Sequence, residues 1–472
     1  MYINGEWLKT TEKIKVVNPA TGDIIDEVFA VGQSETDHAI QAASIAFSFW
    51  SRTTADERAV FLHKITAKLE EKREYLAELI TKEMGKSIHN SRYEVASTIS
   101  FFKWFAEEAR RVYGKTVPAS LSNKRIRVDK HPVGVVAAIT PWNYPLSMIA
   151  RKLGPALAAG CTVILKPSKE APLSAVELFR IFHEVGLPKG VVNLVIGQSG
   201  PISQAFMNSS IVRKISFTGS TEVGKQLIRQ SADTVKRVSM ELGGHAPFIV
   251  FEDADIPLAI EGAIQSKFAS AGQQCVCANR IYVHDKIYEE FSRGFLEKVE
   301  RLRVGNGLDE KNQLGAMINQ EGVEKVHEQV VDAISKGAKV LCGGTRLTEG
   351  AYEKGHFYPP TILTDVHESM VIVHEETFGP VAPLIRFFTE EEVIQKANAI
   401  EYGLASYFYT NDLSRMYRVS ESLEYGMVGV NDPFPFSVQA PFGGIKESGL
   451  GREGGSEGIE EYLSLKMVSV QM

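Results

Sequence analysis

The chain has 472 residues, of which 44% are apolar and 23% are charged, proportions that exclude a fibrous or low-complexity protein. This length predicts two or three packed units rather than one. The 58 acidic and 52 basic residues leave a formal charge of -6 and form no long run of one sign. This charge balance argues against nucleic acid or an anionic membrane as the main binding partner. We expect a small-molecule ligand instead.

The first amphipathic segments along the chain predict helices. Apolar side chains recur there at three- and four-residue spacing with charges between them, over residues 37–49, 56–84 and 93–113. Residues 125–130 alternate in polarity and predict an exposed strand. We therefore expect a helical N-terminal stretch followed by a projecting strand.

From residue 133, apolar β-branched strands alternate with short helices. The predicted strands are 133–139, 162–165, 191–196 and 212–217, and the predicted helices are 145–158 and 173–185. This alternation predicts a parallel sheet covered on both faces, an architecture that binds nucleotides at the carboxyl ends of its strands. Beyond Gly244, strands at 248–250 and 280–283 and helices at 287–303 and 320–336 predict a second α/β domain facing the first.

The sequence shows no signal for secretion, for membrane insertion or for metal binding. Residues 1–7 lack a basic segment followed by an apolar stretch, so we expect a cytoplasmic protein without a secretory signal. The most apolar region, 133–165, is interrupted by Pro141, Arg151 and Pro155, so we expect no membrane span. The four cysteines lack the spacing of a disulfide scaffold or a metal site, and we expect neither.

Two glycine-rich segments are candidates for a phosphate loop. The literal G-x-G-x-x-G at Gly449, Gly451 and Gly454 lies too near the C-terminus for a βαβ unit to follow it, and we expect a surface turn there. Gly219 and Ser220 instead follow a predicted strand and open a predicted helix, whose first N–H groups can meet a phosphate. A turn and helix cap without a ligand is the alternative for this segment.

Four further motifs occur in the order and at about the spacing of one enzyme family. They are Pro141-Trp142-Asn143-Tyr144-Pro145, Met240-Glu241-Leu242-Gly243-Gly244, Gly272-Gln273-Gln274-Cys275 and Glu375-Glu376-Thr377-Phe378-Gly379-Pro380. Together they resemble the aldehyde dehydrogenase superfamily, and the resemblance extends over nearly the whole chain. It implies an α/β fold with a Rossmann-type parallel-sheet cofactor domain, a second α/β catalytic domain and a small β oligomerisation flap.

The resemblance also implies how the chain is divided. We expect the cofactor-binding domain at 1–112 and 132–243, the catalytic domain at 244–445, and oligomerisation segments at 113–131 and 456–472. A homodimer or homotetramer is expected, and the sequence does not choose between them.

Oxidation of an aldehyde to an acid needs a nucleophile that makes the carbonyl carbon a hydride donor, and a cysteine thiolate is suited to this role. The resemblance assigns Cys275 as nucleophile, the Asn143 side chain and the Cys275 backbone N–H as oxyanion donors, and Glu241 as the base that activates water. From the residues alone, Cys275 could be a buried core thiol, Glu241 a helix-capping acid and Asn143 a turn residue.

The resemblance implies a nicotinamide cofactor. Its expected binding residues are Thr140, Trp142, Lys166, Ser168, Lys169, Gly219, Ser220, Leu242, Glu376 and Phe378. Many NAD-preferring members carry a glutamate where this chain has Lys169, and a lysine there would pair with a 2'-phosphate instead of repelling it. We therefore predict that NADP is preferred and NAD is the alternative, unless Lys169 points into solvent.

Subgroup motifs resemble succinate-semialdehyde dehydrogenases, notably residues 275–280 and 441–454. By this resemblance Arg151 and Ser437 hold a substrate carboxylate, with Tyr144 beside them. The subgroup has an arginine six residues before the nucleophile, where this chain has Ala269. Lys267 or Arg280 could compensate for it.

The sequence leaves alternatives open for both the substrate and the class of protein. Succinate semialdehyde is the expected substrate, but Arg151 could form only a structural ion pair. A short neutral aldehyde such as lactaldehyde or glycolaldehyde, or an aromatic one stacked on Tyr144, Phe268 or Phe436, is then the alternative. A non-catalytic binding protein, or an enzyme that passes its acyl group to phosphate or coenzyme A, is the different-class alternative.

Cys277 lies two residues beyond Cys275 and could form a disulfide with it if the loop bends. Oxidation would then switch the enzyme off reversibly. A packing thiol is the alternative role of Cys277.

Overall fold

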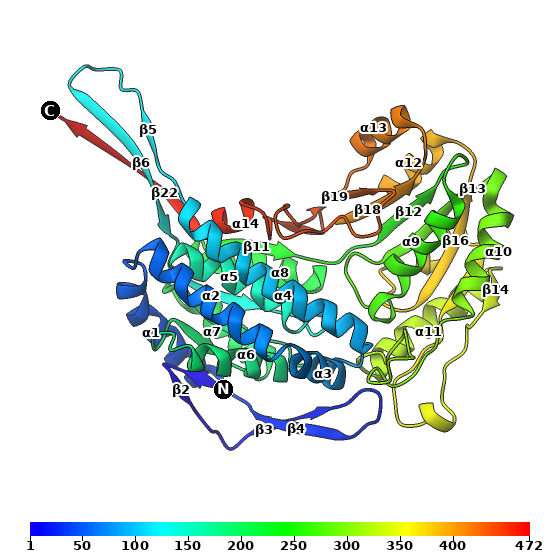
Figure 1. Cartoon of the computed structure of the whole chain (residues 1–472), viewed down its shortest axis with the longest axis horizontal. Coiled ribbons are helices and arrows are strands. Elements are labelled where there is room, and N and C mark those ends of the chain that lie inside the picture. Colours follow the sequence, from blue (N-terminus) through cyan, green and yellow to red (C-terminus); the bar gives the residue numbers. More distant parts are fainter.

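The computed structural model describes all residues, 1–472, and is built around two large sheets (Figure 1). The first has eight strands in the order β2-β1-β9-β8-β7-β10-β11-β21. Its central strands are parallel: β9 (Val192–Leu194), β8 (Thr162–Lys166), β7 (Val135–Ile139), β10 (Val212–Thr218) and β11 (Arg237–Glu241). Its edges are antiparallel: β1 (Tyr2–Ile3), β2 (Glu6–Trp7) and β21 (Gly449–Leu450).

Helices cover both faces of this sheet. In β7, Val136 and Ala138 join the core on one face, whereas Val135, Ala137 and Ile139 join the core on the other. The first face is covered by α2 (Ala55–Glu71), α3 (Arg73–Met84), α4 (Ile88–Glu108), α5 (Ser147–Ala159) and α6 (Leu173–Glu184). The other is covered by α1 (Gln33–Trp50), α7 (Ser199–Asn208) and α8 (Thr221–Ser231). Burial on both sides explains why these strands are continuously apolar.

The second large sheet has seven strands in the order β14-β15-β16-β13-β12-β18-β19, and only β14 runs antiparallel to its neighbour. The strands are β14 (Lys339–Cys342), β15 (Thr361–Thr364), β16 (Val381–Phe387), β13 (Ala278–His284), β12 (Ala246–Val250), β18 (Ala405–Tyr409) and β19 (Met427–Val430). One face packs on α9 (Ile256–Phe268) and α10 (Tyr288–Val299). The other packs on α11 (Gln320–Ser335), α12 (Glu390–Asn398) and α13 (Leu413–Ser422). The predicted α/β architecture is confirmed.

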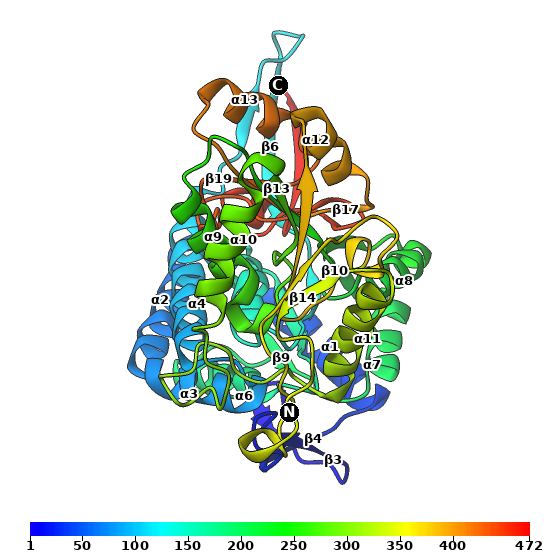
Figure 2. The same cartoon turned by 90° about the vertical axis from the view of Figure 1, so that its right-hand side faces the viewer.

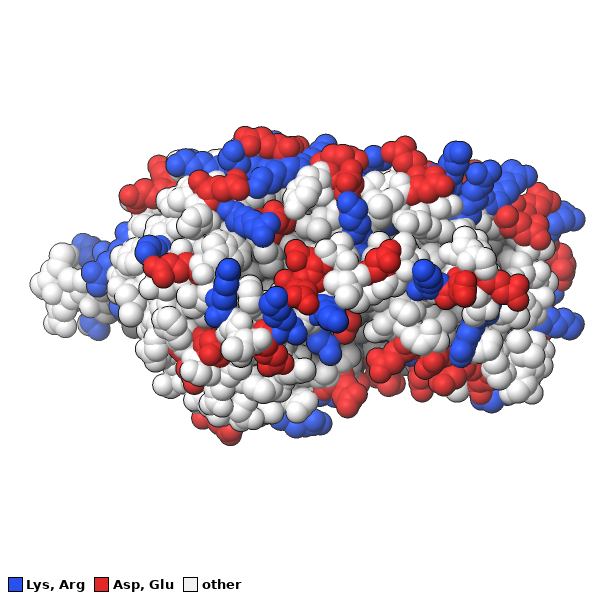
Figure 3. Space-filling view, turned by 90° about the horizontal axis from the view of Figure 1, so that it is seen from below, with Lys and Arg blue, Asp and Glu red and all other residues white.

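A three-stranded sheet projects from the body and carries the C-terminus (Figures 1 and 2). It consists of β5 (Lys115–Val117), β6 (Lys124–Pro132) and β22 (Leu463–Gln471), and we call it the flap. The predicted exposed strand is therefore confirmed as part of β6. The face drawn in Figure 3 carries acidic and basic side chains interspersed, with the flap extending beyond it.

Smaller elements complete the chain. They are β3 (Lys13–Val17) paired with β4 (Ile24–Phe29), β17 (Tyr402–Gly403) paired with β20 (Ile445–Lys446), and α14 (Glu457–Glu460). None of the helices combines the length and the apolar character that crossing a membrane requires.

The N-terminal helices differ from the prediction at their ends. The helix expected over 56–84 is two helices, because Lys72 leaves helical geometry at φ -100° and ψ 12°. The last helix of this group begins at Ile88 and ends at Glu108, where a short 3-10 turn follows. Both helices bury apolar residues, so the apolar periodicity continues from α2 into α3. The sequence pattern therefore does not show where the first helix ends.

We propose that the domain boundaries follow the sheets as expected. Residue 244 lies between β11, the last strand contributed by the first half, and β12 of the second sheet. The segment 446–455 fell outside the expected domains, and it returns to the first sheet through β21.

Candidate active site

The carboxyl ends of the parallel strands meet at one edge of the first sheet. Thr140 follows β7 and donates its N–H to the Lys166 carbonyl at 3.1 Å, and Gly219 follows β10 and donates to the Glu241 carbonyl at 3.0 Å. Residues predicted from separate motifs are thereby brought to the same edge.

A cavity of about 500 Å³, which we call the strand-edge cavity, lies between this edge and the second unit. Of the predicted cofactor residues, its walls include Trp142, Gly219, Ser220, Leu242, Glu376 and Phe378. The Trp142 and Phe378 rings meet edge to face with centroids 5.5 Å apart. Thr140, Lys166, Ser168 and Lys169 are not among its lining residues, but they lie at or just beyond the ends of the neighbouring strands β7 and β8.

Gly219 and Ser220 shape the helix start in this cavity. Ser220 caps α8, and its Oγ accepts the Val223 N–H at 3.4 Å. A Cβ on Gly219 would lie 2.4 Å from the Phe217 ring, so only glycine fits there. The nearby hydroxyls of Thr218 and Thr377 are buried without hydrogen-bond partners. A helix start and unpaired polar groups suit a phosphate-bearing ligand.

The opposite wall of the strand-edge cavity was not predicted from the sequence. It includes Asn319, Gly322 and Lys325 at the start of α11. The sequence analysis treated this segment only as an amphipathic helix. Asn319 is a typical N-cap residue, and a lysine follows in the second turn of the helix. This pattern could have indicated a polar helix start at the cavity.

Cys275 lies where the strand-edge cavity meets a second cavity, and it lines both. The loop before it turns sharply: Ser270, Ala271 and Gly272 all have positive φ, and a Cβ on Gly272 would lie 2.2 Å from the Gly379 carbonyl oxygen. Burial raises the pKa of the Cys275 thiol to about 12, the Glu376 carboxylate adds to the rise, and the Arg151 guanidinium opposes it. Both burial and Glu376 therefore favour the thiol form over the thiolate.

Asn143 is buried beside the nucleophile loop. Its Nδ2 donates to the Gln273 carbonyl at 3.0 Å, two residues before Cys275. An amide nitrogen carries two hydrogens, so a second donor is available in the strand-edge cavity, which Asn143 lines.

Glu241 ends β11 and is buried, with its Oε2 lacking a hydrogen-bond partner. Burial raises its pKa well above the ordinary value, and the neighbouring Glu453 raises it further, whereas Lys152, Arg151 and Arg452 act in the opposite direction. Lys152 donates to Glu453 at 2.7 Å. The carboxyl group therefore holds a proton more strongly than an exposed glutamate does.

The literal glycine motif begins beside the backbone of Glu241. Gly449 pairs with Glu241 through β21, and a Cβ there would lie 2.0 Å from the Met240 carbonyl oxygen. The expectation of a surface turn was therefore wrong, because Gly449 belongs to the edge strand β21 and both Gly449 and Gly454 are buried. The glycines of the motif permit close backbone approach rather than phosphate binding.

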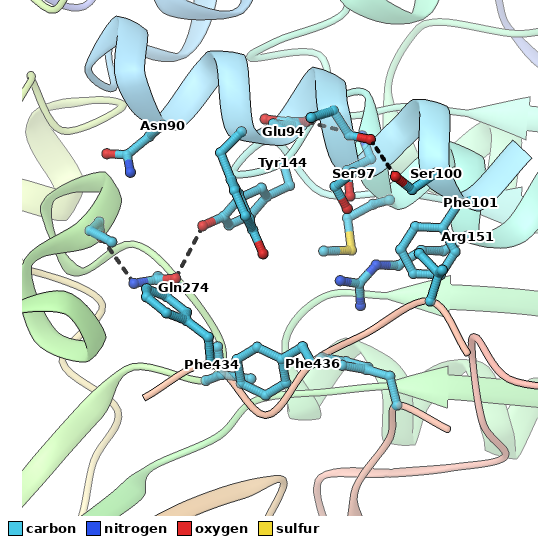
Figure 4. Close-up of a pocket in the computed structure, with 18 of the residues that line it drawn as sticks. Asn90, Glu94, Ser97, Ser100, Phe101, Tyr144, Arg151, Gln274, Phe434 and Phe436 are labelled. Atoms are coloured by element: carbon cyan, nitrogen blue, oxygen red, sulfur yellow. Dashed lines mark hydrogen bonds between the residues drawn. The ribbon is translucent and has the colours of Figure 1, made fainter. Parts of the chain in front are cut away.

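The second cavity, also of about 500 Å³, has aromatic walls, and we call it the aromatic cavity (Figure 4). It contains all three predicted substrate residues, Arg151, Ser437 and Tyr144. The Arg151 guanidinium lies between the Phe101 and Phe442 rings, with its carbon 4.9 and 4.3 Å from their centroids. Its Nε and Nη1 are buried without hydrogen-bond partners, and the nearest carboxylate oxygen, on Glu453, is 4.0 Å away.

One wall of the aromatic cavity comes from α4, which the sequence analysis treated as a plain amphipathic helix. Asn90, Glu94, Ser97 and Ser100 all line the cavity from this helix (Figure 4). Polar residues recur there at three- and four-residue spacing, a pattern shared with solvated helix faces, so no signal in the sequence distinguishes this cavity wall.

The expected compensation for Ala269 is absent. Ala269 lines the aromatic cavity, but Lys267 donates to Asn279 Oδ1 at 2.8 Å and Arg280 donates to the backbone carbonyls of His245 and Ala397. Both cations are fully buried and neither lines the cavity, so that prediction was wrong. Phe268 is likewise a core residue, with its ring stacked on Phe295 at 6.1 Å, whereas Tyr144 and Phe436 line the cavity.

Cys277 is fully buried, with Sγ 3.4 Å from Lys267 Nζ and 3.4 Å from the Lys267 carbonyl oxygen. Cys275 and Cys277 are both free thiols in the structure. A disulfide between them would require Cys277 to leave these contacts, and it remains a hypothesis.

Comparison with known proteins identifies the family. Residues 7–468 match the model of the aldehyde dehydrogenase family. The chain is 51% identical over 469 residues to 3-sulfolactaldehyde dehydrogenase of Pseudomonas putida, covering 99% of this chain and 96% of that protein. It is 50% identical to glutarate-semialdehyde dehydrogenase of Pseudomonas putida KT2440, covering 100% of this chain and 97% of that one. It is also 50% identical to the Escherichia coli succinate-semialdehyde dehydrogenase (NADP(+)) GabD, covering 99% and 97%.

The solved structure of succinate-semialdehyde dehydrogenase from Burkholderia pseudomallei superposes with a TM-score of 0.98 at 47% identity, covering 100% of this chain and 97% of that one. The fold expected from the motifs is thereby confirmed. With the family model matched from residue 7 to residue 468 and these relatives aligned end to end, the chain belongs to the aldehyde dehydrogenase family.

Proposed function

We propose that this aldehyde dehydrogenase oxidises an aldehyde that carries a terminal carboxylate, with succinate semialdehyde as the first candidate and NADP as the preferred cofactor. The observation that carries this proposal is the position of Cys275, which lines both the strand-edge cavity and the aromatic cavity. A thiol at that junction can contact a substrate from one side and a cofactor from the other. Relatives named for succinate, glutarate and sulfolactaldehyde substrates support an anionic aldehyde without choosing among them.

The strand-edge cavity fits a dinucleotide. The start of α8 at Ser220 and the Gly219 turn would receive phosphates, Trp142 and Phe378 would flank the ligand, and Glu376 would bind a ribose. When bound, the nicotinamide supplies the acceptor for the hydride that leaves the substrate.

Cys275 and Asn143 act in the first half of the proposed reaction. The Cys275 thiol first loses its proton to solvent water at the junction of the cavities. The resulting thiolate sulfur then forms a bond to the aldehyde carbon, and the carbon–oxygen π bond breaks to leave an oxyanion. The Asn143 amide and the Cys275 backbone N–H stabilise that charge. Loss of the hydride then leaves a thioester on Cys275.

Glu241 acts in the second half of the proposed reaction, the hydrolysis of the thioester. Its carboxylate takes a proton from a water molecule, whose oxygen bonds to the thioester carbon, and the carbon–sulfur bond breaks to release the acid and regenerate Cys275. Burial and the neighbouring Glu453 raise the pKa of Glu241, which makes it a stronger base than an exposed glutamate. A water-activating base also favours hydrolysis over transfer of the acyl group to phosphate or coenzyme A.

Arg151 is the proposed anchor for the substrate carboxylate. Arg151 lines the aromatic cavity, and its Nε and Nη1 lack hydrogen-bond partners, with Glu453 4.0 Å from Nη1. An anion in the cavity would pair with the guanidinium, and Ser437 would add a hydroxyl. Ala269 supports the alternative of a neutral or aromatic aldehyde, because it leaves this anchor with a single guanidinium.

The assignment of Cys275 and Glu241 is tested by following NADPH and acid together, with succinate semialdehyde and no added acyl acceptor. We expect Cys275→Ala to produce neither, and Glu241→Gln to give one burst of NADPH and then release acid at least about 100-fold more slowly than wild type. Cys342→Ala, at a half-buried thiol on β14, is the matched control and should keep full activity. Turnover by Cys275→Ala would refute the proposal.

The carboxylate anchor is tested with Arg151→Met, which keeps apolar volume between the two phenylalanine rings. We expect kcat/KM for succinate semialdehyde to fall about 10- to 100-fold, since a charge-assisted hydrogen bond contributes about 1.5–3 kcal/mol. Activity on propanal reports the loss of the Arg151 charge near Cys275 and Glu241, so it is the internal control and should fall less than activity on succinate semialdehyde. If wild type uses succinate semialdehyde no better than propanal, and Arg151→Met affects both equally, the carboxylate assignment is wrong.

A further inference from the structure

A buried ion pair lies behind the Asn143 segment. Lys86 follows the left-handed end of α3 at Gly85, and its Nζ forms an ion pair with Glu94 of α4. Both side chains are completely shielded from solvent. None of the steps proposed above uses this pair, although removing two charges from water is costly.

The pair fixes the segment that carries Asn143. Lys86 Nζ donates to the Asn143 carbonyl oxygen at 2.9 Å, and it lies 3.9 Å from the centroid of the Tyr144 ring. Glu94 Oε1 accepts the N–H groups of Leu146 and Ser147 at 2.8 and 3.0 Å. The two side chains thus hold the backbone from residue 143 to residue 147.

The same segment is bonded to the nucleophile loop on its other side. Asn143 Nδ2 donates to the Gln273 carbonyl, and the Tyr144 hydroxyl donates to Gln274 Oε1 at 3.1 Å. Lys86 therefore determines where the Asn143 peptide lies while the side-chain amide faces the residues just before Cys275. A shift of about 1 Å in a reacting group can cost about 100-fold in rate.

We infer that Lys86 is a positioning residue for the oxyanion: by holding the Asn143 carbonyl, it aims the Asn143 amide at the oxygen of the substrate bound to Cys275. This inference rests on the roles proposed for Cys275 and Asn143. Lys86 itself contacts neither the substrate nor the cofactor, since it lines neither the strand-edge nor the aromatic cavity.

The chain provides a matched buried lysine that lacks this geometry. Lys236 donates its Nζ to the carbonyls of Ser209 and Val212 and is 7% exposed. It lies just before β11, at the end of the strand opposite Glu241. Lys236→Met therefore removes a buried ammonium from backbone carbonyls without touching the Asn143 segment.

The test is a double-mutant cycle with Lys86→Met and Asn143→Ala, in which kcat, both KM values and the melting temperature are measured. We expect Lys86→Met to lower kcat about 10- to 100-fold with little change in KM for the cofactor, and to lower it less than about 3-fold when Asn143 is already alanine. Lys236→Met should lower the melting temperature and leave kcat unchanged.

A stability loss could accompany Lys86→Met, because Glu94 would be left unpaired in the interior. The variant with both Lys86→Met and Glu94→Gln removes both charges but keeps a side-chain oxygen that can accept the Leu146 and Ser147 N–H groups. We expect this variant to retain its melting temperature and still show the reduced kcat.

The outcomes separate the two proposals. Turnover by Cys275→Ala would overturn the proposed function itself. If Cys275→Ala is inactive and Asn143→Ala is slow, but Lys86→Met lowers kcat by the same factor in both backgrounds or no more than Lys236→Met does, then Lys86 is merely structural and the inference fails.

Discussion

Burial determines the ionisation of the three acidic groups around the junction of the cavities. It raises the pKa of Cys275 to about 12 and that of Glu376 to about 7, and it raises the pKa of Glu241 well above its ordinary range. All three shifts favour the neutral form, because a charge is poorly solvated there. Burial thus shifts both the nucleophile and the base toward their protonated forms.

The rate of thioester hydrolysis should consequently depend on pH. Only the carboxylate form of Glu241 accepts a proton from water, and a raised pKa means that this form develops at higher pH than for an ordinary glutamic acid of pKa 4.5. We expect acid release after the NADPH burst to accelerate with rising pH, with a midpoint above 4.5. Glu241→Gln should abolish the dependence. A flat profile in wild type would exclude Glu241 as the base.

Cofactor choice is expected to depend on Lys169. This side chain is about half exposed, and it is 4.0 Å from Glu170, so its ammonium is accessible to a phosphate. It also contributes to the lowered pKa of Lys166, about 8, although burial is the larger cause. Lys169→Glu should shift the ratio of kcat/KM for NADP over NAD toward NAD by about tenfold or more, because a carboxylate repels the 2'-phosphate. An unchanged ratio would disprove this role.

Most catalytic candidates could be predicted from local motifs because those motifs lie in short, geometrically demanding segments. The prediction that Lys267 or Arg280 compensates for Ala269 was wrong because of the direction of the two side chains. On β13, Arg280 lies on the same side as Tyr282, which belongs to the core packed on α11. Lys267 is likewise directed at Asn279 rather than at the aromatic cavity. A motif gives a residue's position along the chain, whereas the face on which it lies depends on packing that no single segment reveals.

At the scale of elements, helices supply cavity walls that strand-end motifs do not indicate. α4 forms one wall of the aromatic cavity and α11 closes the strand-edge cavity. Their polar residues resemble those of any solvated helix face in the sequence. Which face meets a cavity depends on how the two sheets are set against each other, and periodicity carries no information about that.

The flap is the element for which we predict an effect on assembly. On β22, Leu465 and Met467 are 67% and 64% exposed, an unusual position for apolar side chains on a projecting strand. We propose that they are covered in a homodimer or homotetramer. The double substitution Leu465→Asp and Met467→Asp should reduce the mass measured by light scattering to that of a smaller species.

Val235→Asp is the control for this experiment. Val235 is 86% exposed, lies before β11 and has a positive φ, which aspartate tolerates better than valine. This variant should keep the wild-type mass. An unchanged mass for the flap variant would show that these side chains do not hold the subunits together.

For the whole molecule, the alternation of strands and helices was sufficient to predict two parallel-sheet units, but not their strand orders. The order β9-β8-β7-β10-β11 follows partly from right-handed crossovers between parallel strands. The edge strand β21 could not be predicted, because two residues near the C-terminus have too short a pattern to indicate that they join a sheet formed by the first half of the chain.

That edge strand has a consequence for biosynthesis. Domains generally fold as they leave the ribosome, N-terminal part first, yet some of the residues around Glu241, namely Gly443, Gly449, Arg452 and Glu453, come from near the end of the chain. A nascent polypeptide can assemble most of the first sheet while the carboxylate at its edge is still open to water. The part of that proton affinity contributed by Glu453 and Arg452 is therefore acquired only after nearly the whole chain has been translated.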